Sequence, residues 1–451
     1  MKKLISILAV ASILVACNHP SVPTDAKQES RLPRIYPDYT EVTIPFNICP
    51  LNFAVQEGAD EVVARFSYPG GEMTYGNEQK VQIDEDEWQD ILKSAKGQSI
   101  QVDVYAHVGG TWKAFKPFNI YVAEDSIDHY ISYRVIQPSY VAYERLSINQ
   151  RNLTSFEEKE IYSNMAVSTE STGQCINCHS YQNYKTDNML FHMRQGYGGT
   201  MLVTNGELRK IDLKTDETLS AGVYPAWHPT KNLIAFSTNK TGQSFHTKDL
   251  NKIEVQDTES DLILYDVEKN EVSIISEMDD ELEVFPTWSP DGLTLYYISA
   301  HHDPIGSDID ADLDQNYETL HYNIYARDFN LDTRQFGPRR LVFDAESLGK
   351  SASTPRVSPD GQWLLFSLAD YGQFHVWHKS ADLWMCSLNS LTPSLTTNPS
   401  PKERGVVTDG VHEGNVVDTS LNNASSNNIS SSVLARSSNH APLLGRGVGG
   451  E

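Results

Sequence analysis

Three copies of one motif in the second half of the chain limit its possible folds more than any other feature. They read YPAWHP at 224–229, FPTWSPDG at 285–292 and TPRVSPDG at 354–361, and each precedes an apolar run such as LYYIS at 295–299. A strand, a tight Pro-Asp-Gly turn and a second strand form a β-hairpin, and recurring hairpins are typical of β-propeller blades. The repeats therefore predict a mainly β chain with propeller blades over residues 199–395.

Shorter β-type runs fill the region before the repeats. Residues 62–68 (VVARFSY) and 100–106 (IQVDVYA) alternate apolar and polar side chains and are followed by glycine-rich turns. Alternation with period two between turns predicts a small immunoglobulin-like β-sandwich over residues 39–125. One helical stretch, 86–95, interrupts it, and Cys49 in the first strands is expected to be a buried free thiol.

The first residues have the pattern of an export signal. Two lysines precede an apolar run that is too short for a membrane span. The run ends in LVAC, which resembles the lipobox of bacterial lipoproteins. The resemblance implies that residues 1–17 are a signal peptide with its lipobox, and that Cys17 becomes a lipidated N-terminus whose partner is membrane lipid. An ordinary secretory signal with a chance cysteine is the alternative.

The residues after Cys17 bear on where the protein lies. Asn18 is not the aspartate that retains lipoproteins at the inner membrane in the best-known sorting rule, and no acidic run resembling a surface-export signal follows it. We therefore expect a lipid-anchored protein on the periplasmic side, at the outer membrane. Residues 18–38 hold four prolines among polar groups, which predicts a flexible tether.

The pentapeptide CINCH at 175–179 carries the clearest chemical signal. In an exported chain, C-x-x-C-H indicates covalent attachment of one haem c. Cys175 and Cys178 would form the two thioethers, and His179 would be the proximal ligand of the iron. A redox disulfide, half of a zinc site and a chance match are the alternatives, although the other cysteines are scattered singly and do not supply a second zinc-ligand pair.

The surroundings of the motif suggest a second iron ligand. Strand alternation fades over residues 126–198, where a helix over 148–165 is expected to lead into a partly helical segment for haem attachment. We predict His192 as the sixth ligand, with Met189 and Met193 as alternatives. His179 and His192 would then be the metal ligands of a low-potential bis-histidine iron. An ordinary structural role is open for each of the three.

The repeats closely resemble the WD40-like blades of TolB-type proteins, in which P-x-W-S-P-D-G precedes an aliphatic-aromatic strand. The resemblance covers the three copies, although the first has Lys231 in place of the Asp-Gly pair. Lipobox, sandwich, haem motif and repeats, in this order, resemble a group of Bacteroidetes lipoproteins with a haem motif and a TolB-like propeller. The resemblance implies a fold and a cell-envelope location more than a chemistry, because one fold serves many functions.

The end of the chain does not continue the blade pattern. Residues 396–451 are rich in Asn, Ser and Gly and have almost no aromatic side chains, which predicts a disordered, atypical tail. A ring generally needs ~4 to 8 blades. The repeats therefore suggest a truncated propeller with an exposed blade edge, or one that a partner chain closes.

Composition and motif searches exclude several functions. With 36 Lys and Arg against 60 Asp and Glu, the net charge of −24 argues against a nucleic-acid partner. Residues 308–314 alternate carboxylates as a calcium loop does, but Leu313 stands where such a loop needs glycine. His301 and His302 are neighbours, so they would point to opposite faces of a strand. No G-x-S-x-G or H-E-x-x-H motif is present.

Three functions remain. The first is a membrane-anchored haem c protein that acts in electron transfer or in redox-dependent binding of a protein partner, at the haem or at the propeller face. The second is a haem-free, TolB-like scaffold for protein or glycan partners. The third, an oxidoreductase, would need an open position on the iron. We expect an electron carrier or a binding protein rather than an enzyme.

Overall fold

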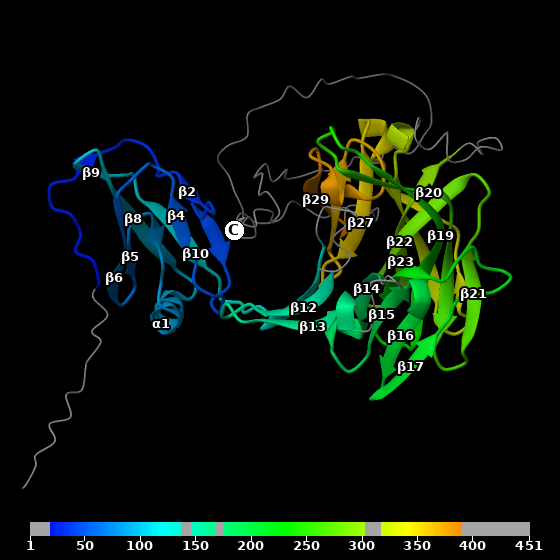
Figure 1. Ribbon diagram of the computed structural model, residues 1–451. Coiled ribbons are helices and arrows are strands. Elements are labelled where there is room, and N and C mark those ends of the chain that lie inside the picture. The colour runs from blue at the N-terminus through cyan, green and yellow to red at the C-terminus, as the bar shows by residue number, and fades with distance from the viewer. Residues whose placement is uncertain (1–18, 137–145, 167–174, 303–316, 390–451) are drawn as a thin grey trace, which may run out of the picture. The chain divides into compact units, whose positions relative to one another are not determined.

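The computed structural model describes residues 19–136, 146–166, 175–302 and 317–389, which form two compact units (Figure 1). The first unit comprises the described residues up to Ser132 together with Gln150–Lys159. The second unit comprises the described part of Tyr133–Asn149 and the described residues from Glu160 onward. Strands predominate in the regular structure of both units, and α1 is the one α-helix among the described residues, so the prediction of a mainly β chain is confirmed. No helix in these ranges is long and apolar enough to span a bilayer.

Two sheets and one helix build the first unit. The larger sheet has the order β1-β9-β8-β10-β3, and it continues from β8 through β5 to β6. Its strands are β1 (Lys27–Gln28), β3 (Val42–Ile44), β5 (Glu61–Tyr68), β6 (Gly71–Tyr75), β8 (Ser99–Val108), β9 (Thr111–Ala114) and β10 (Phe118–Val122). The smaller sheet has the order β2-β4-β7, with the strands β2 (Ile35–Tyr36), β4 (Phe53–Val55) and β7 (Lys80–Val81). The strands predicted at 62–68 and 100–106 lie in β5 and β8, so both are confirmed.

The helix α1 (Glu85–Ala95) agrees with the helical stretch predicted at 86–95. It begins where one carboxylate oxygen of Asp84 accepts hydrogen bonds from the backbone N–H groups of Asp86 and Glu87, at 3.0 and 3.1 Å. Its apolar face carries Trp88, which is fully buried and donates its indole N–H to the carbonyl of Ile48 at 3.1 Å. The helix and both sheets share one hydrophobic core, which makes them a single folding unit.

Strands replace the helix that was predicted over 148–165. A three-stranded sheet has the order β11-β12-β13, with β11 (Tyr130–Val135), β12 (Ser147–Asn152) and β13 (Glu158–Ser163). The side chain of Asn152 accepts from the backbone N–H of Thr154 at 2.9 Å, and this Asx turn reverses the chain. The apolar side chains whose spacing suggested a helix, Phe156 and Ile161, are exposed. The predicted helical haem-attachment segment is therefore a strand-rich segment.

Three sheets follow in the second unit, and we divide their strands into four groups, blades 1 to 4, because a single parallel pair, Ser260 with Leu282, joins the two halves of the nine-stranded sheet (Figure 1). Blade 1 consists of β14 (Cys175–Tyr181), β15 (Met189–Arg194), β16 (Gly199–Thr204) and β17 (Glu207–Ile211). Blade 2 consists of β18 (Val223–Trp227), β19 (Leu233–Phe245), β20 (Ile253–Asp266) and β21 (Glu271–Ser276). Blade 3 consists of β22 (Glu281–Trp288), β23 (Thr294–His301), β24 (Asn323–Asn330), β25 (Gln335–Phe336) and β26 (Arg340–Phe343). Blade 4 consists of β27 (Ser351–Val357), β28 (Trp363–Ala369) and β29 (Asp382–Ser387).

The three hairpins predicted from the repeats are confirmed. They are the antiparallel pairs β18/β19, β22/β23 and β27/β28. Blade 1 differs from the expectation, because it begins at Cys175 and not near residue 199: β14 and β15 pair with β16 and β17. The predicted signal peptide, lipobox cysteine Cys17, acidic loop at 308–314 and tail at 396–451 lie outside the described residues.

The first strand of every blade has the same backbone irregularity. The pairing register breaks in each of these strands, around Cys178, Tyr224, Phe285 and Thr354. These residues have φ values of 54°, 49°, 55° and 47°, in the left-handed region that costs a non-glycine residue ~1–2 kcal/mol. Packing offsets part of this cost, since the rings of Tyr224 and Phe285 meet edge to face at 4.4 Å.

In the turns of the hairpins, side chains accept hydrogen bonds from backbone N–H groups. In blade 3, the hydroxyl of Ser289 donates to Asp291 at 2.5 Å and accepts from the N–H of Thr294 at 2.9 Å. In blade 2, His228 closes the turn instead of a serine. Its Nδ1 accepts from the backbone N–H groups of Thr230 and Lys231 at 3.2 and 3.1 Å. The motif copy without Asp-Gly therefore still forms the turn.

His228 also joins two blades. Since its Nδ1 is an acceptor, its Nε2 carries the proton and donates to the carbonyl of Gly292 at 3.1 Å. The ring is fully buried and packs edge to face on Trp288, with 4.9 Å between centroids. This neutral imidazole therefore links the turn of blade 2 to the turn of blade 3.

We expect Gly292→Ala to destabilise the second unit strongly. Its φ is +74°, and a Cβ atom there would lie 2.3 Å from Nε2 of His228. Left-handed strain and overpacking together should lower the free energy of unfolding by about 3 kcal/mol or more. Gly349→Ala is the matched control, since its φ is +62° and its Cβ would meet nothing within 4 Å. Equal losses for both variants in urea titrations followed by tryptophan fluorescence would contradict the blade contact.

We expect the free energy of unfolding of His228→Asn to depend less on pH between 6.5 and 4 than that of the unaltered protein. Burial lowers the pKa of His228 from 6.5 to about 4, so between these values the unfolded chain binds a proton that the folded chain does not. The stabilising contribution of the neutral ring is complete above pH 6.5 and falls by up to about 3 kcal/mol as the pH decreases to 4. Asparagine can accept the same N–H groups without titrating. A stability difference between the two proteins that stays constant with pH would refute a buried neutral imidazole.

Candidate functional site

The haem motif lies within the first strand of blade 1. Cys178 occupies the left-handed position that Tyr224, Phe285 and Thr354 occupy in the other blades. Both thiols are free and half-buried. Burial raises the pKa of the Cys178 thiol, although the backbone N–H of Tyr224 donates to it and two arginines lie near it. The thiol is therefore protonated at neutral pH.

A polar cavity of about 740 Å³ lies beside this strand. The strand β15, which pairs with β14, contributes His192, Met193 and Arg194 to its wall, and Arg194 lies opposite Cys175 in the register. Arg194 and Lys214 are its cations and Asp212 is its carboxylate. The volume is typical of sites for small molecules and cofactors.

The predicted iron ligands lie on two paired strands, His179 on β14 and His192 on β15. His192 is 4% exposed, its Nδ1 lies 3.1 Å from the hydroxyl of Thr200, and burial lowers its pKa to about 4. His179 follows the register break and does not line the cavity; its ring meets that of Tyr181 at 6.0 Å. Of the alternatives, Met193 lines the cavity and Met189 pairs with Tyr181 at the other end of the strand.

The residues present fit the chemistry of a haem c group in part. Two free thiols and an adjoining imidazole occur on one strand, and a cavity with more cations than carboxylates, suited to propionates, lies next to that strand. His192 lines the cavity from β15, and His179 lies on the paired strand β14. Within the described ranges, no group of three or more His, Cys, Asp or Glu side chains could hold a bare metal ion.

A buried carboxylate that the sequence did not reveal lies near the cavity. Asp257 of β20 is fully buried and accepts hydrogen bonds from Asn239 at 2.5 Å, Thr241 at 2.7 Å and Gln373 at 2.6 Å. Burial outweighs these donors and raises its pKa to about 6. The hydroxyl of Tyr322 extends the network by donating to Gln373 at 2.5 Å. Asn239 and Thr241 also line the cavity, so the network supports its wall.

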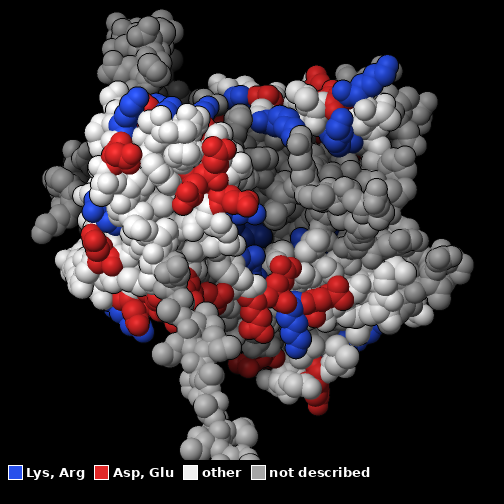
Figure 2. Space-filling model, turned by 60° about the vertical axis from the view of Figure 1, so that its left-hand side comes forward, with Lys and Arg blue, Asp and Glu red and all other residues white. Residues whose placement is uncertain are grey.

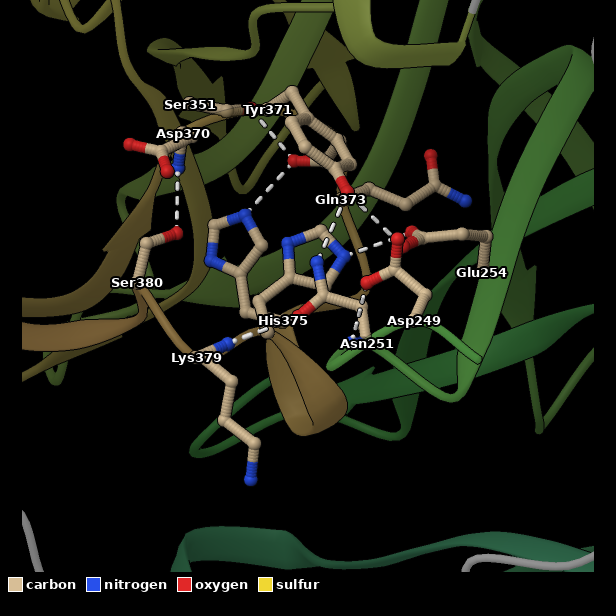
Figure 3. Close-up of polar contacts among 12 residues, drawn as sticks. Asp249, Asn251, Glu254, Ser351, Asp370, Tyr371, Gln373, His375, Lys379 and Ser380 are labelled. Carbon is tan, nitrogen blue, oxygen red and sulfur yellow. Dashed lines mark hydrogen bonds and ion pairs between the residues drawn. The ribbon is translucent and has the colours of Figure 1, made fainter. Parts of the chain in front are cut away.

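The network depends on a hairpin that extends beyond its blade. The paired ends of β19 and β20, residues 239–258, form an arm that reaches the segment between β28 and β29 of blade 4 (Figure 1). Figure 3 shows Asn251 and Glu254 of the arm facing Tyr371 and Gln373. Tyr371 donates to Glu254 at 3.1 Å and accepts from Asn251 at 2.9 Å.

A buried contact between His378 and Glu254 completes this interface. Nε2 of His378 lies 2.8 Å from a carboxylate oxygen of Glu254, and both side chains are nearly fully buried. The backbone N–H of Lys379 donates to Asn251 at 3.1 Å. The arm therefore joins blades 2 and 4 through several polar contacts. The alternation of polar residues beyond the apolar part of each strand was the only sequence signal for it.

The comparisons with known proteins assign no family. No protein-family profile matches the chain, and no curated protein matches it significantly. The nidogen/laminin complex is similar with 10% identity and a TM-score of 0.35, over 73% of this chain and 90% of that chain. Oligogalacturonate lyase from Vibrio parahaemolyticus is similar with 11% identity and a TM-score of 0.29, over 76% of this chain and 80% of that chain. Similarity at this level gives no argument about activity.

We expect Asp257→Ala to cost about 3 kcal/mol or more in the free energy of unfolding, because the buried side chains of Asn239 and Gln373 and the hydroxyl of Thr241 lose their acceptor. Asp249→Ala is the control: Asp249 is an exposed residue of the same arm whose side chain accepts from the N–H of Asn251. Urea titration at neutral pH measures both variants. Similar small losses would show that the network does not stabilise the arm.

Proposed function

We propose that this protein is a membrane-anchored, periplasmic binding protein that carries one covalent haem c and acts in electron transfer or in redox-dependent binding of a protein partner. Cys175 and Cys178 would hold the porphyrin and His179 the iron. The observation that carries the proposal is the C-x-x-C-H strand next to a cavity in which cations outnumber carboxylates. When bound, haem c supplies one-electron chemistry that no amino-acid side chain of the site offers.

The chain's own residues have defined tasks in this proposal. Arg194, opposite Cys175, would pair with a propionate and so orient the group, with Lys214 as a second cation. His192 is neutral at pH 7, as an iron ligand must be, and its hydrogen bond with Thr200 fixes the ring. Met193 is the alternative ligand on the cavity wall.

The finer points of architecture and location belong to the same proposal. Blades 1 to 4 would be of the TolB-like, WD40-like type, and the first unit would be immunoglobulin-like. Lipidation of Cys17 would anchor the protein to the outer membrane, with the tether at 18–38 giving it reach. No nucleic acid would bind, because Asp and Glu predominate in the chain and are spread over the visible face (Figure 2).

A haem-free scaffold for protein or glycan partners is the second candidate. One observation favours it: Cys178 stands at a position that Tyr224, Phe285 and Thr354 fill in the other blades, and none of these three side chains could form a thioether. The strand thus has a structural reason for its shape that is independent of haem. The two candidates differ in whether exported protein carries the group.

A pyridine-haemochrome spectrum decides between them. We expect the full chain, exported in a host with c-type maturation machinery, to show a c-type band that is lost in Cys178→Ala. Cys386→Ala is the matched control, since Cys386 is a half-buried free thiol of blade 4 and should leave the band unchanged. Folded protein without a band would refute the haem proposal and favour the scaffold. In protein with a band, binding of carbon monoxide to the reduced form would indicate an iron without a sixth protein ligand.

A further inference from the structure

The repeated motif builds a second pocket, of about 220 Å³, on the same blades. Its lining comes from the ends of the first strands and from the hairpin turns, and it includes prolines and aromatic side chains from several copies of the motif. Cys175, Cys178, His179 and His192 do not line it. The lining residues used below are Tyr181, Tyr184, Trp227, Trp288, Pro286 and Arg356.

Equivalent positions of the four blades meet in this pocket. Two residues after the left-handed position of each first strand stand Ser180, Ala226, Thr287 and Arg356, and all four line the pocket. Three of these side chains are small, and the fourth is an arginine. The small residues leave space in the middle of the pocket, and Arg356 supplies its charge.

Arg356 has no counter-charge there. No Asp or Glu is among the described lining residues, and the guanidinium donates instead to the neighbouring carbonyl of Pro355 at 2.7 Å. Part of the Arg356 side chain is exposed to solvent. Protein atoms nevertheless surround the guanidinium, and this desolvation lowers its pKa. Arginine nevertheless stays charged at any physiological pH. A cation without a carboxylate is unusual in a chain of net charge −24.

The walls favour one kind of anion. Trp227, Trp288 and Pro286 give the pocket flat apolar surfaces, and Tyr181 and Tyr184 add hydroxyl groups. A phosphate with about two negative charges would need more than one cation and several further donors. A carboxylate matches the two-pronged geometry of one guanidinium. An aromatic ring attached to it would pack against the tryptophan and proline faces.

The indole N–H groups of the two lining tryptophans differ in their hydrogen bonds. That of Trp227 is buried and has no hydrogen-bond partner among the described residues. Buried N–H groups without an acceptor are rare in folded proteins. Trp288 differs, because its indole N–H donates to the carbonyl of Ala226 at 3.1 Å.

We propose that this pocket binds a small aromatic carboxylate, whose acid group pairs with Arg356 and whose ring lies against the tryptophan and proline walls. The ligand is either a free aromatic acid or the C-terminal aromatic residue of a peptide, since both present the same group. This site is separate from the proposed haem site, and its function does not depend on haem.

Isothermal titration of the full chain tests the proposal, with 3-phenylpropionate as the free acid and acetyl-Gly-Phe as the peptide. We expect saturable binding of at least one of them, weakened about tenfold or more when its carboxylate is converted to the amide. The stronger of the two identifies the source of the ligand. Absence of saturable binding of both acids would overturn the proposal.

Variants of Arg356 give the second readout. Arg356→Gln should weaken binding of the acid about tenfold or more and leave binding of the amide unchanged, whereas Arg356→Lys should retain part of the preference for the acid. Arg340→Gln, at an exposed arginine of blade 3, is the matched control and should bind like the unaltered protein. Equal affinity of Arg356→Gln and the unaltered protein for the acid would refute the assignment. Were Arg356→Gln to unfold, the comparison of acid with amide on the unaltered protein would still decide.

Discussion

The blades depend on one backbone constraint, a non-glycine residue held at φ near +50° in the first strand of each. Cys178, Tyr224, Phe285 and Thr354 share it, although they have no side-chain chemistry in common. What they share is position: the strand pairs regularly on either side and breaks register there. Because each break shifts the following side chains, the residue two positions after it lines the pocket around Arg356 in all four blades. Local strain therefore sets the geometry of a common surface.

Sequence reasoning succeeded where the controlling interactions are local. Two of the three predicted hairpins have S-P-D-G turns that Ser and Asp side chains close within a few residues, and His228 closes the third turn equally locally. The helix α1 was predictable for the same reason, since Asp84 caps it. Blade 1 was misplaced because its first strand, CINCHSY, has none of the prolines or tryptophans of the motif. Its strand character comes from pairing with β15, which no short pattern reveals.

The candidate site needed contacts that are distant in the chain. Asp257 and Gln373 are 116 positions apart, and neither belongs to a motif. In the sequence, Arg356 resembles any other charged residue. Its distinction is that the equivalent positions of the other blades hold the small residues Ser180, Ala226 and Thr287. The haem motif, in contrast, was plain in the sequence, and the structure adds the cavity and the cations beside it. Its predicted ligands His179 and His192 lie on neighbouring strands but in different surroundings.

The arm of blade 2 has a consequence for how such a chain could change length during evolution. Repeat proteins commonly gain or lose units, because each unit contacts only its neighbours. Here Glu254 and Asp257 are buried by residues of blade 4, which is two blades away. Deleting blade 4 would remove Tyr371 and His378 from Glu254 and Gln373 from Asp257, and inserting a blade before it would move those partners out of reach. The hydrogen bonds between the arm of blade 2 and the segment between β28 and β29 therefore fix the number of blades between them, independently of whether the ring closes.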